Sequence, residues 1–283
     1  MENFAGLSGT DADYQTSKIV VLPVPYDATS SWIKGADRGP EALLEASVQL
    51  EYFDTETGAE VYRQGIHTAA PVLEQSSPEA LCDAVEKRVA AVMDDEKFPV
   101  IIGGNHTVSI GAFRAVAARV DNLTIVQLDA HTDLRASYEG SELNHACVMF
   151  QAQKLAPITQ IGIRSMCKQE MNCFDPARIF FARDIFFDQT NRWEQEALDT
   201  LSRNVYLTID LDVFDPSIMP STGTPEPGGL TYFCVLRFLR RLFRTSNVVG
   251  CDIVELCPNP HVKAPDYLAA RLAYQLMTYK FRR

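Results

Sequence analysis

Acidic and imidazole side chains gather directly after three apolar runs of this chain. They are Asp129, His131 and Asp133, then Asp210 and Asp212, and also His106. The runs 99–102, 123–128 and 205–209 have the pattern of buried strands in a parallel sheet, which are hydrophobic on both faces. In open α/β sheets, ligands bind beyond the carboxyl ends of the strands. These six side chains therefore predict a metal site, one with two ions.

The spacing within the clusters supports this interpretation. Side chains two residues apart on a strand point to the same face, so the carboxylates of Asp210 and Asp212 are expected to aim one way, like the side chains of Asp129 and His131. Carboxylates this close repel one another unless a divalent cation lies between them. Oxygen-rich sites with a few imidazoles favour Mn²⁺, Mg²⁺ or Fe²⁺ over thiolate-bound zinc. Alternatively, the polar residues of the two clusters only form turns and helix caps. That interpretation could explain either cluster alone, but it explains less well why both clusters occur at strand ends.

Composition limits the classes of function. The chain has 283 residues, of which 46% are hydrophobic, and a net charge of −11. This suits one α/β domain over residues 1–283 and disfavours nucleic acid or an acidic membrane as partner, whereas a small cationic substrate fits the charge. Seven cysteines without a C-x-x-C pair predict neither disulfides nor a thiolate zinc site. Without a signal-peptide pattern or an apolar run of about 20 residues, we expect a cytoplasmic protein.

The elements that must position the clusters alternate along the chain. Strands are expected over 18–25, 67–73, 98–102, 123–129, 158–163, 178–181, 205–210 and 248–254. Helices are expected over 40–52, 78–94, 108–120, 146–154, 192–202, 232–243 and 265–280. Such alternation predicts an α/β three-layer sandwich, in which a mainly parallel sheet of about eight strands is flanked by helices on both faces.

The motifs resemble those of the ureohydrolases, the family of arginases and agmatinases, and are most similar to agmatinases. They are Gly103-Gly-Asn-His-Thr107, Asp129-Ala-His-Thr-Asp133, Ile161-Gly-Ile-Arg-Ser165, Thr208–Pro216 with Gly223-Thr-Pro225 and Gly228-Gly229, and Asp252-Ile-Val-Glu255. The resemblance implies an arginase-like fold and a centre of two Mn²⁺ ions per chain. One ion would be bound by His106, Asp129, Asp133 and Asp210, and the other by Asp129, His131, Asp210 and Asp212. Asp129 and Asp210 would bridge the two ions.

The resemblance also implies the reaction, hydrolysis of a guanidine to urea and an amine. Two neighbouring ions can make a shared water nucleophilic near neutral pH. His145 matches the proton shuttle for the leaving amine, although a loop histidine is more often a plain surface residue. Glu255 matches the carboxylate that grips the guanidinium, rather than an ordinary strand-end charge. Asp133 is a candidate catalytic residue as well as a ligand. The family further implies a homo-oligomer, a trimer or hexamer.

One residue departs from the family pattern. Many members carry an acidic residue directly before the first histidine ligand, where this chain has Asn105. Since Asn105 is not a predicted ligand, the ligand set stays complete. We expect the change to alter metal affinity through the surroundings of the ligands more than it alters activity.

We expect the loop 134–145 to contact the substrate tail and to determine which tail is accepted. It resembles the agmatinase version, with Tyr138-Glu-Gly140 and then a histidine. Glu139 and Glu142 are expected to repel the carboxylate of arginine or guanidinobutyrate and to attract a dication. Agmatine, which would give putrescine and urea, is therefore the first choice. The segment 146–149 resembles relatives that act on longer guanidines such as N1-aminopropylagmatine, so the chain-length preference stays open.

Two functions of other classes are weaker. A non-catalytic metal-binding subunit of a homologous enzyme would have no reason to keep six ligands. A deacetylase-like hydrolase would use two adjacent histidines, and no two of the five histidines are neighbours. His67 and His261 have no motif partner and are expected to lie outside the site. The loop with Tyr26, Asp27 and Trp32 could wall the pocket, but simple loop packing is the preferred interpretation.

Overall fold

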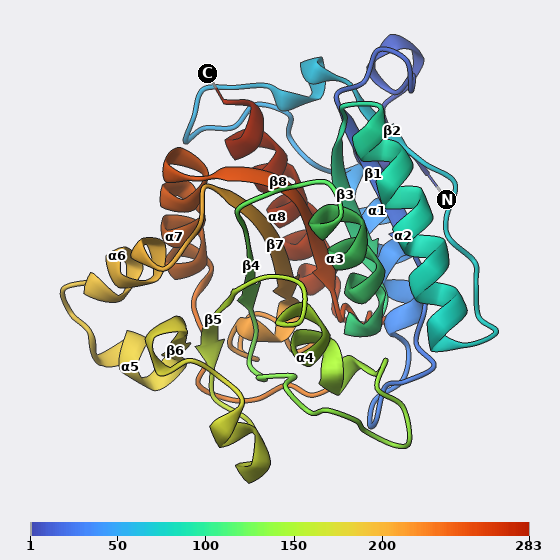
Figure 1. Ribbon diagram of the computed structural model, residues 1–283. Coiled ribbons are helices and arrows are strands. Elements are labelled where there is room, and N and C mark those ends of the chain that lie inside the picture. Colours follow the sequence, from blue (N-terminus) through green and yellow to red (C-terminus); the bar gives the residue numbers. More distant parts are fainter. Residues whose placement is uncertain (1, 283) are drawn as a thin grey trace.

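The computed structural model describes residues 2–282, and its centre is one sheet of eight parallel strands (Figure 1). The strands are β1 (Ile19–Val24), β2 (Ile66–Thr68), β3 (Phe98–Gly103), β4 (Leu123–Leu128), β5 (Ile158–Ile163), β6 (Ile179–Phe181), β7 (Asn204–Asp210) and β8 (Asn247–Val254). Their order across the sheet is β2-β1-β3-β8-β7-β4-β5-β6. All of the pairings are parallel, as the apolar runs predicted.

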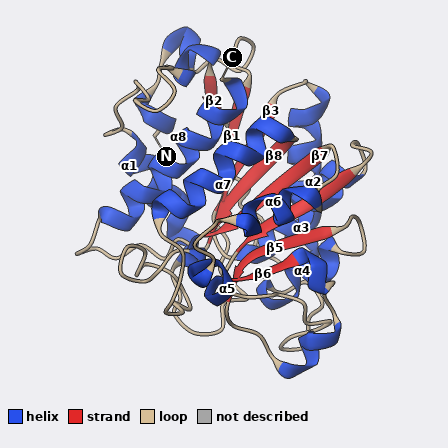
Figure 2. Ribbon diagram, turned by 90° about the vertical axis from the view of Figure 1, so that its left-hand side faces the viewer, coloured by secondary structure: helices blue, strands red, loops and turns tan. Residues whose placement is uncertain are grey.

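Helices cover both faces of the sheet, which makes three layers (Figure 2). On one face, α2 (Pro78–Asp94), α3 (Ser109–Ala117) and α4 (Val148–Ala152) share one hydrophobic core with the strands. On the other face lie α1 (Gly39–Ser47), α5 (Ala182–Phe187), α6 (Arg192–Asp199), α7 (Tyr232–Thr245) and α8 (Ala264–Phe281), which share a second core. The predicted three-layer α/β sandwich is confirmed. Within residues 2–282, no helix is long and apolar enough to span a bilayer.

Local capping explains where the predicted helices are right and where they are wrong. Helix α2 has the predicted bounds, because the side chain of Ser77 accepts a hydrogen bond from the Ala80 amide at 3.1 Å. Helix α1 ends at Ser47 instead of continuing to residue 52. The Ser47 hydroxyl donates to the Leu44 carbonyl at 2.6 Å and accepts from the Ala5 amide at 2.8 Å, so it ties the helix end to the N-terminal segment. Helix α5 was not predicted.

The order of the strands explains why the polar clusters meet. Strands β3, β8, β7 and β4 are consecutive in the centre of the sheet, and all four run in the same direction. Their carboxyl ends therefore lie side by side, although they are separated by up to about 150 positions in the chain. The loops after β1 and β5 flank the same edge. This edge of the sheet carries the candidate site.

Candidate metal centre

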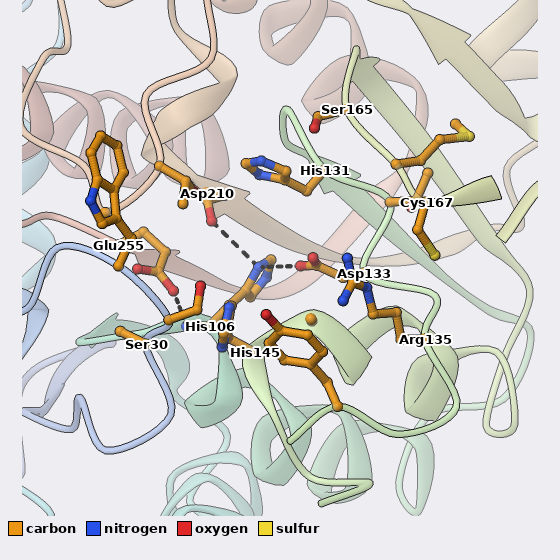
Figure 3. Close-up of a pocket in the computed structure, with 18 of the residues that line it drawn as sticks. Ser30, His106, His131, Asp133, Arg135, His145, Ser165, Cys167, Asp210 and Glu255 are labelled. Carbon is orange, nitrogen blue, oxygen red and sulfur yellow. Dashed lines mark hydrogen bonds and ion pairs between the residues drawn. The ribbon is translucent and has the colours of Figure 1, made fainter. Parts of the chain in front are cut away.

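The first half of the site surrounds His106, which follows β3. Its Nδ1 atom lies 3.2 Å from Asp129 Oδ2, 3.1 Å from Asp133 Oδ2 and 3.6 Å from Asp210 Oδ2. All four side chains are buried. Figure 3 shows Asp133 and Asp210 reaching the His106 ring from different sides. One imidazole nitrogen and three carboxylate oxygens thus converge on a single point.

The second half surrounds His131. Its Nδ1 atom lies 2.9 Å from Asp212 Oδ2 and 3.6 Å from Asp129 Oδ1. Asp129 therefore faces both histidines, with one oxygen toward each. The structure brings five of the predicted ligands together as two groups that share Asp129, and Asp133 joins the His106 group through its contact with Nδ1. Asp210 lies in the His106 group.

Turns, and not strand alternation, bring these side chains together. Strand β4 ends at Leu128, and Asp212 lies in a short 3₁₀ turn, Leu211–Val213. The expectation of two carboxylates on one face of a strand was therefore wrong. Instead, Asp129 Oδ1 accepts from the amide of His131 at 2.6 Å, and Asp210 Oδ1 accepts from the amide of Asp212 at 2.8 Å. Each of these turns folds the second residue back toward the first.

Two observations fit this site to bound metal ions. The Nδ1 atom of His106 is buried and has no hydrogen-bond partner among residues 2–282. The second observation is that the buried aspartates repel one another. Burial, with the charges of Asp212 and Asp129, raises the pKa of Asp210 well above its ordinary value. Burial and the charge of Asp129 raise the pKa of Asp133 to about 6. Four aspartates held this close need neutralising positive charge, and divalent ions supply it.

A buried chain of hydrogen bonds fixes the His106 ring from behind. Its Nε2 atom lies 2.9 Å from Thr208 Oγ1, and the Thr208 hydroxyl donates to Asp252 Oδ1 at 2.5 Å. Tyr206 donates to the other Asp252 oxygen at 2.8 Å. A threonine has only one hydroxyl hydrogen, so Thr208 must accept from Nε2–H. This leaves the lone pair of His106 Nδ1 directed at the carboxylates, the arrangement that orients metal-bound histidines.

Two buried glutamines hold Asp129 in a similar way. Gln127 donates to Asp129 Oδ2 at 2.6 Å, and Gln160 donates to Gln127 Oε1 at 2.6 Å. Gln127 lies on β4 and Gln160 on β5, directly opposite each other. Sequence reasoning missed both glutamines, as it missed Thr208. The available signal was a polar residue inside an otherwise apolar strand, because such a residue needs a buried partner.

Glu255 forms the pocket wall beside His106. It follows β8 with a φ of +66°, a left-handed conformation that is uncommon for a residue with a side chain. Glu255 Oε1 accepts from the His106 amide at 2.7 Å. Burial raises the pKa of Glu255 to about 8. Figure 3 shows Glu255 and Asp133 on opposite sides of His106, so the predicted guanidinium grip borders the first group of ligands.

His145 lies in the same pocket, at the start of a short 3₁₀ helix, His145–Cys147. Its ring packs edge-on against Tyr138, with ring centroids 5.9 Å apart. Its Nδ1 atom is buried and has no partner within the described chain. Burial lowers the pKa of His145 to about 4. The side chain is therefore a neutral imidazole at pH 7.

Asn105 joins the ligand His106 to the loop after β1. It is fully buried, and its amide donates to Thr29 Oγ1 at 2.6 Å. Asn105 Oδ1 also accepts from the amide of Thr107 at 3.3 Å. The residue that departs from the family pattern is thus a bridge between a ligand segment and a pocket wall.

Two further motif residues brace the loop after β7. Arg164 donates to the carbonyl oxygens of Asp212 at 2.6 Å and of Glu226 at 2.8 Å. Asp215 accepts from the amides of Gly228 at 3.0 Å and Gly229 at 3.1 Å. Through these contacts, the motifs that contain Arg164 and the glycine pair hold the loop that follows Asp210 in place.

The cavity over the two groups has a volume of about 270 Å³. Its lining corrects two expectations. Glu139 and Glu142 do not line it; Glu139 lies in a tight turn, and Glu142 lies 3.9 Å from Lys154. The residues of the loop 134–145 in the wall are Arg135, Tyr138 and His145. Trp32 also lines the cavity, so loop packing was the wrong interpretation for it.

The remaining residues of the first loop and the two unassigned histidines have structural surroundings. Tyr26 is buried, and Asp27 accepts a hydrogen bond from the Gly35 amide. His67 packs edge-on against Tyr14, and His261 is exposed. Neither histidine lines the cavity.

Known proteins share both the sequence and the fold. Residues 17–279 match the arginase family. An N(1)-aminopropylagmatine ureohydrolase from Synechocystis sp. is 43% identical over 277 residues, 94% of this chain and 90% of that protein. An agmatinase from Bacillus cereus is 34% identical over 250 residues, 87% and 85% of the two chains. The crystal structure of the agmatine ureohydrolase of Thermoplasma volcanium has a TM-score of 0.88 at 33% identity, covering 100% of this chain and 95% of that one. The chain therefore belongs to the arginase family of ureohydrolases, hydrolases that cleave guanidino C–N bonds.

Proposed function

We propose that this protein is a manganese-dependent hydrolase that releases urea from a guanidine whose tail ends in an amine, with agmatine as a substrate and putrescine as the second product. The observation that carries the proposal is the convergence of four aspartates and two histidines beside the unpaired oxygen of Glu255. A metal centre next to a carboxylate pocket is suited to a small cation that must be attacked by water.

The ligands would hold two ions as the family resemblance implies. His106 and Asp133 would bind one ion, and His131 and Asp212 would bind the other. The structure places Asp129 in both groups and Asp210 in the His106 group, and the family resemblance implies that both aspartates would be shared between the ions. Four carboxylates with two imidazoles suit Mn²⁺. When bound, two such ions supply a nucleophilic water near neutral pH and polarise the substrate.

Glu255 would orient the substrate. Its Oε1 atom is used by the His106 amide, whereas Oε2 has no hydrogen bond among the described residues. Gly223 borders this oxygen, since a Cβ atom there would lie 3.7 Å from Oε2, in ordinary van der Waals contact. A guanidinium can donate to the free oxygen in a directional, charge-assisted hydrogen bond. The positive charge of the bound guanidinium would stabilise the ionised carboxylate of Glu255, which burial otherwise disfavours.

Asp133 and His145 would handle the protons. Asp133 lines the cavity beside His106, and its carboxylate could accept a proton from the attacking water. The amine must leave with a proton, since an amide anion is a poor leaving group. His145 lines the cavity as a neutral imidazole, and it can take up a proton and deliver it to the amine nitrogen.

N1-aminopropylagmatine is a second candidate substrate. The Synechocystis relative named for it is 43% identical, against 34% for the Bacillus cereus agmatinase. The two substrates share the guanidinium and the first four methylenes, so the metal centre does not distinguish them. Arg135 in the wall would attract a carboxylate, so arginine and guanidinobutyrate remain candidates too.

Urea release from these four guanidines tests the proposal. The two relatives compared above are an N(1)-aminopropylagmatine ureohydrolase and an agmatinase. On that ground, and despite Arg135, we expect the manganese-loaded protein to hydrolyse agmatine or N1-aminopropylagmatine with a kcat/KM at least tenfold above that for the two carboxylates. The variant Asp129→Asn, which removes the shared ligand, is expected to lose both metal and urea release. Failure to release urea from any of the four substrates by metal-loaded protein would refute the proposal.

The family also leads us to propose that the enzyme is a homo-oligomer, a trimer or hexamer, in the cytoplasm. Exposed apolar side chains suitable for contacts between copies are present, among them Phe186 at 80% and Phe187 at 72% exposure. Light scattering of the purified protein measures the assembly, and a mass of one chain, 31.5 kDa, would contradict it.

A further inference from the structure

An aromatic side chain stands exposed at the wall of the metal pocket. Trp32 and Ile33, in the loop between β1 and α1, line the cavity yet are 69% and 40% exposed. Exposing an indole to water is unfavourable, because the ring can bury 150–250 Å² of surface. Large apolar side chains exposed in a cavity wall indicate contact with a ligand.

The exposure of Trp32 does not come from a loose loop. Asp27 accepts from the Gly35 amide at 2.6 Å and also from the Ser30 hydroxyl, so the loop is closed on both sides of Trp32. Thr29 is fixed to the buried Asn105 amide at 2.6 Å. Beyond Trp32, the Cys257 thiol donates to the Lys34 carbonyl at 3.3 Å. The backbone around the indole is therefore braced against the body of the protein.

The loop that carries Trp32 and Ile33 lies close to Glu255, the residue predicted to bind the guanidinium. A Cβ atom on Gly223 would lie 3.4 Å from the Ile33 carbonyl oxygen and 3.7 Å from Glu255 Oε2. Only the width of one small residue thus separates the Trp32 loop from the carboxylate. A substrate with its guanidinium at Glu255 would therefore have this loop within reach of its tail.

The part of the wall formed by Arg135 and Tyr138 is unfavourable for a cation. Tyr138 lines the cavity, but the Arg135 guanidinium lies over its ring, 4.4 Å from the centroid. That ring face already binds a cation, and the charge of Arg135 repels a second one. Of the aromatic rings that line the cavity, Trp32 is the one free to receive a cationic tail.

We propose that Trp32 is the specificity residue for the far end of the substrate tail. Its indole packs on the methylenes and attracts the amine beyond them, so that guanidines with a longer, amine-bearing tail are preferred over those without one. The inference rests on the proposed ureohydrolase function and extends it to the choice of substrate. N1-aminopropylagmatine, which carries two amines in its tail, is expected to gain most from this contact.

Kinetics with three guanidines test the role of Trp32. The manganese-loaded full chain is assayed with N1-aminopropylagmatine, agmatine and butylguanidine, whose tail has no amine. Trp32→Ala is expected to lower kcat/KM for N1-aminopropylagmatine by roughly 5- to 30-fold, the range of a partly desolvated cation–π contact, and for butylguanidine by less than about twofold. Trp32→Phe, which keeps an aromatic face, should retain most of the preference.

Phe233→Ala provides the matched control, since Phe233 is 79% exposed and lies outside the cavity lining. It is expected to change none of the three values. Equal losses for all three substrates in Trp32→Ala, or no loss for N1-aminopropylagmatine, would overturn the inference while the proposed function stands. A changed oligomeric mass of Trp32→Ala would also overturn it, because Trp32 would then serve an interface. Absence of urea from every substrate with the unsubstituted protein would instead reject the proposed function.

Discussion

His106 is prepared for metal binding by the residues behind it. Thr208 accepts a hydrogen bond from Nε2–H at 2.9 Å, and its hydroxyl donates a hydrogen bond to Asp252. Tyr206 also donates a hydrogen bond to Asp252. Burial raises the pKa of Asp252, and the hydrogen bonds from Thr208 and Tyr206 oppose that shift. The ring therefore cannot turn without leaving buried groups unpaired. Its free Nδ1 atom stays directed at the aspartates.

Thr208→Val removes the hydroxyl and keeps the shape of the side chain. We expect metal affinity to fall about 10- to 100-fold, the usual effect of losing a partner of a metal-bound histidine. Metal titration followed by calorimetry measures this loss. Thr159→Val is the control, because Thr159 is also buried on a strand and bonds Thr200 instead of the site. Equal affinity of Thr208→Val and the unsubstituted protein would contradict the proposed role of the hydroxyl.

His145 makes the stability of the protein depend on pH. Its pKa is lowered to about 4 in the folded state, against an ordinary value of 6.5. Between these values the unfolded chain binds a proton that the folded chain does not, so the free energy of unfolding falls as the pH decreases from 6.5 to 4. The contribution lost is on the order of 3 kcal/mol.

His145→Asn should reduce this pH dependence. Urea-induced unfolding of metal-free protein at several pH values gives the free energy of unfolding for both proteins. We expect a shallower decrease below pH 6.5 in the variant. An identical slope in both proteins would show that His145 is not buried as a neutral imidazole.

At the scale of elements, the loop between β1 and α1 and the segment after β3 form one unit. Asn105 lies directly before His106 and donates to Thr29 at 2.6 Å, which ties the Trp32 loop to the metal ligand. The Thr29 hydroxyl in turn lies 2.9 Å from that of Thr107. A change at Asn105 therefore acts on the pocket wall and on the ligand together.

Asn105→Ala leaves this buried network without its donor. We expect a loss of about 1–3 kcal/mol in the free energy of unfolding and a higher KM for amine-tailed guanidines, because the Trp32 loop is released. Asn105→Asp, the acidic residue usual in the family, is the milder variant, since Thr29 can reverse its hydroxyl and donate. Denaturation and steady-state kinetics measure both effects. Unchanged stability and KM in Asn105→Ala would exclude the bridging role.

The elements themselves could be predicted from local patterns, whereas the contacts between them could not. The runs before Asp129 and Asp210 predict buried strands, since nearly every position in them is apolar. Thr208 is a polar residue in the second run, which signals a buried partner, but the sequence does not say which residue that partner is. Trp32 lies in a loop, and its place in the cavity wall depends on which segments lie opposite. The pairing of Thr208 with Asp252 joins β7 to β8 across 44 positions of the chain.

The same limit applies to charges in a loop. Glu139 and Glu142 suggested an acidic pocket from their positions near His145. The hydrogen bonds between Tyr138 and Ser141 form a tight turn that places Glu139 at its tip. The turn geometry, and not the net charge of the segment, decides which side chains reach the cavity.

At the scale of the whole molecule, the metal centre couples stability to ligand binding. Four aspartates at or just after the carboxyl ends of β4 and β7 converge on two histidines. Their repulsion opposes the meeting of these strand ends, and bound ions reverse it. Ions that bind only the folded chain add about 2.7 kcal/mol at 100 times their dissociation constant.

Removal of metal should therefore destabilise the fold. We expect chelation to lower the Tm by roughly 5–10 °C for a chain of this size. Differential scanning calorimetry with and without a chelator measures the shift, and added Mn²⁺ should restore the Tm. Asp129→Asn provides the control, because it should show little response to chelation. The same Tm with and without chelator would argue against a metal that supports the fold.

The dependence of urea release on bound metal tests the two-ion centre most directly. Chelated protein is titrated with Mn²⁺, and urea release from agmatine and N1-aminopropylagmatine is followed together with metal content by mass spectrometry. We predict no urea without metal and a rise in activity that reaches its maximum at two ions per chain. Full activity in metal-free protein, saturation at one ion, or no urea from protein that holds two ions would contradict the two-ion hydrolase.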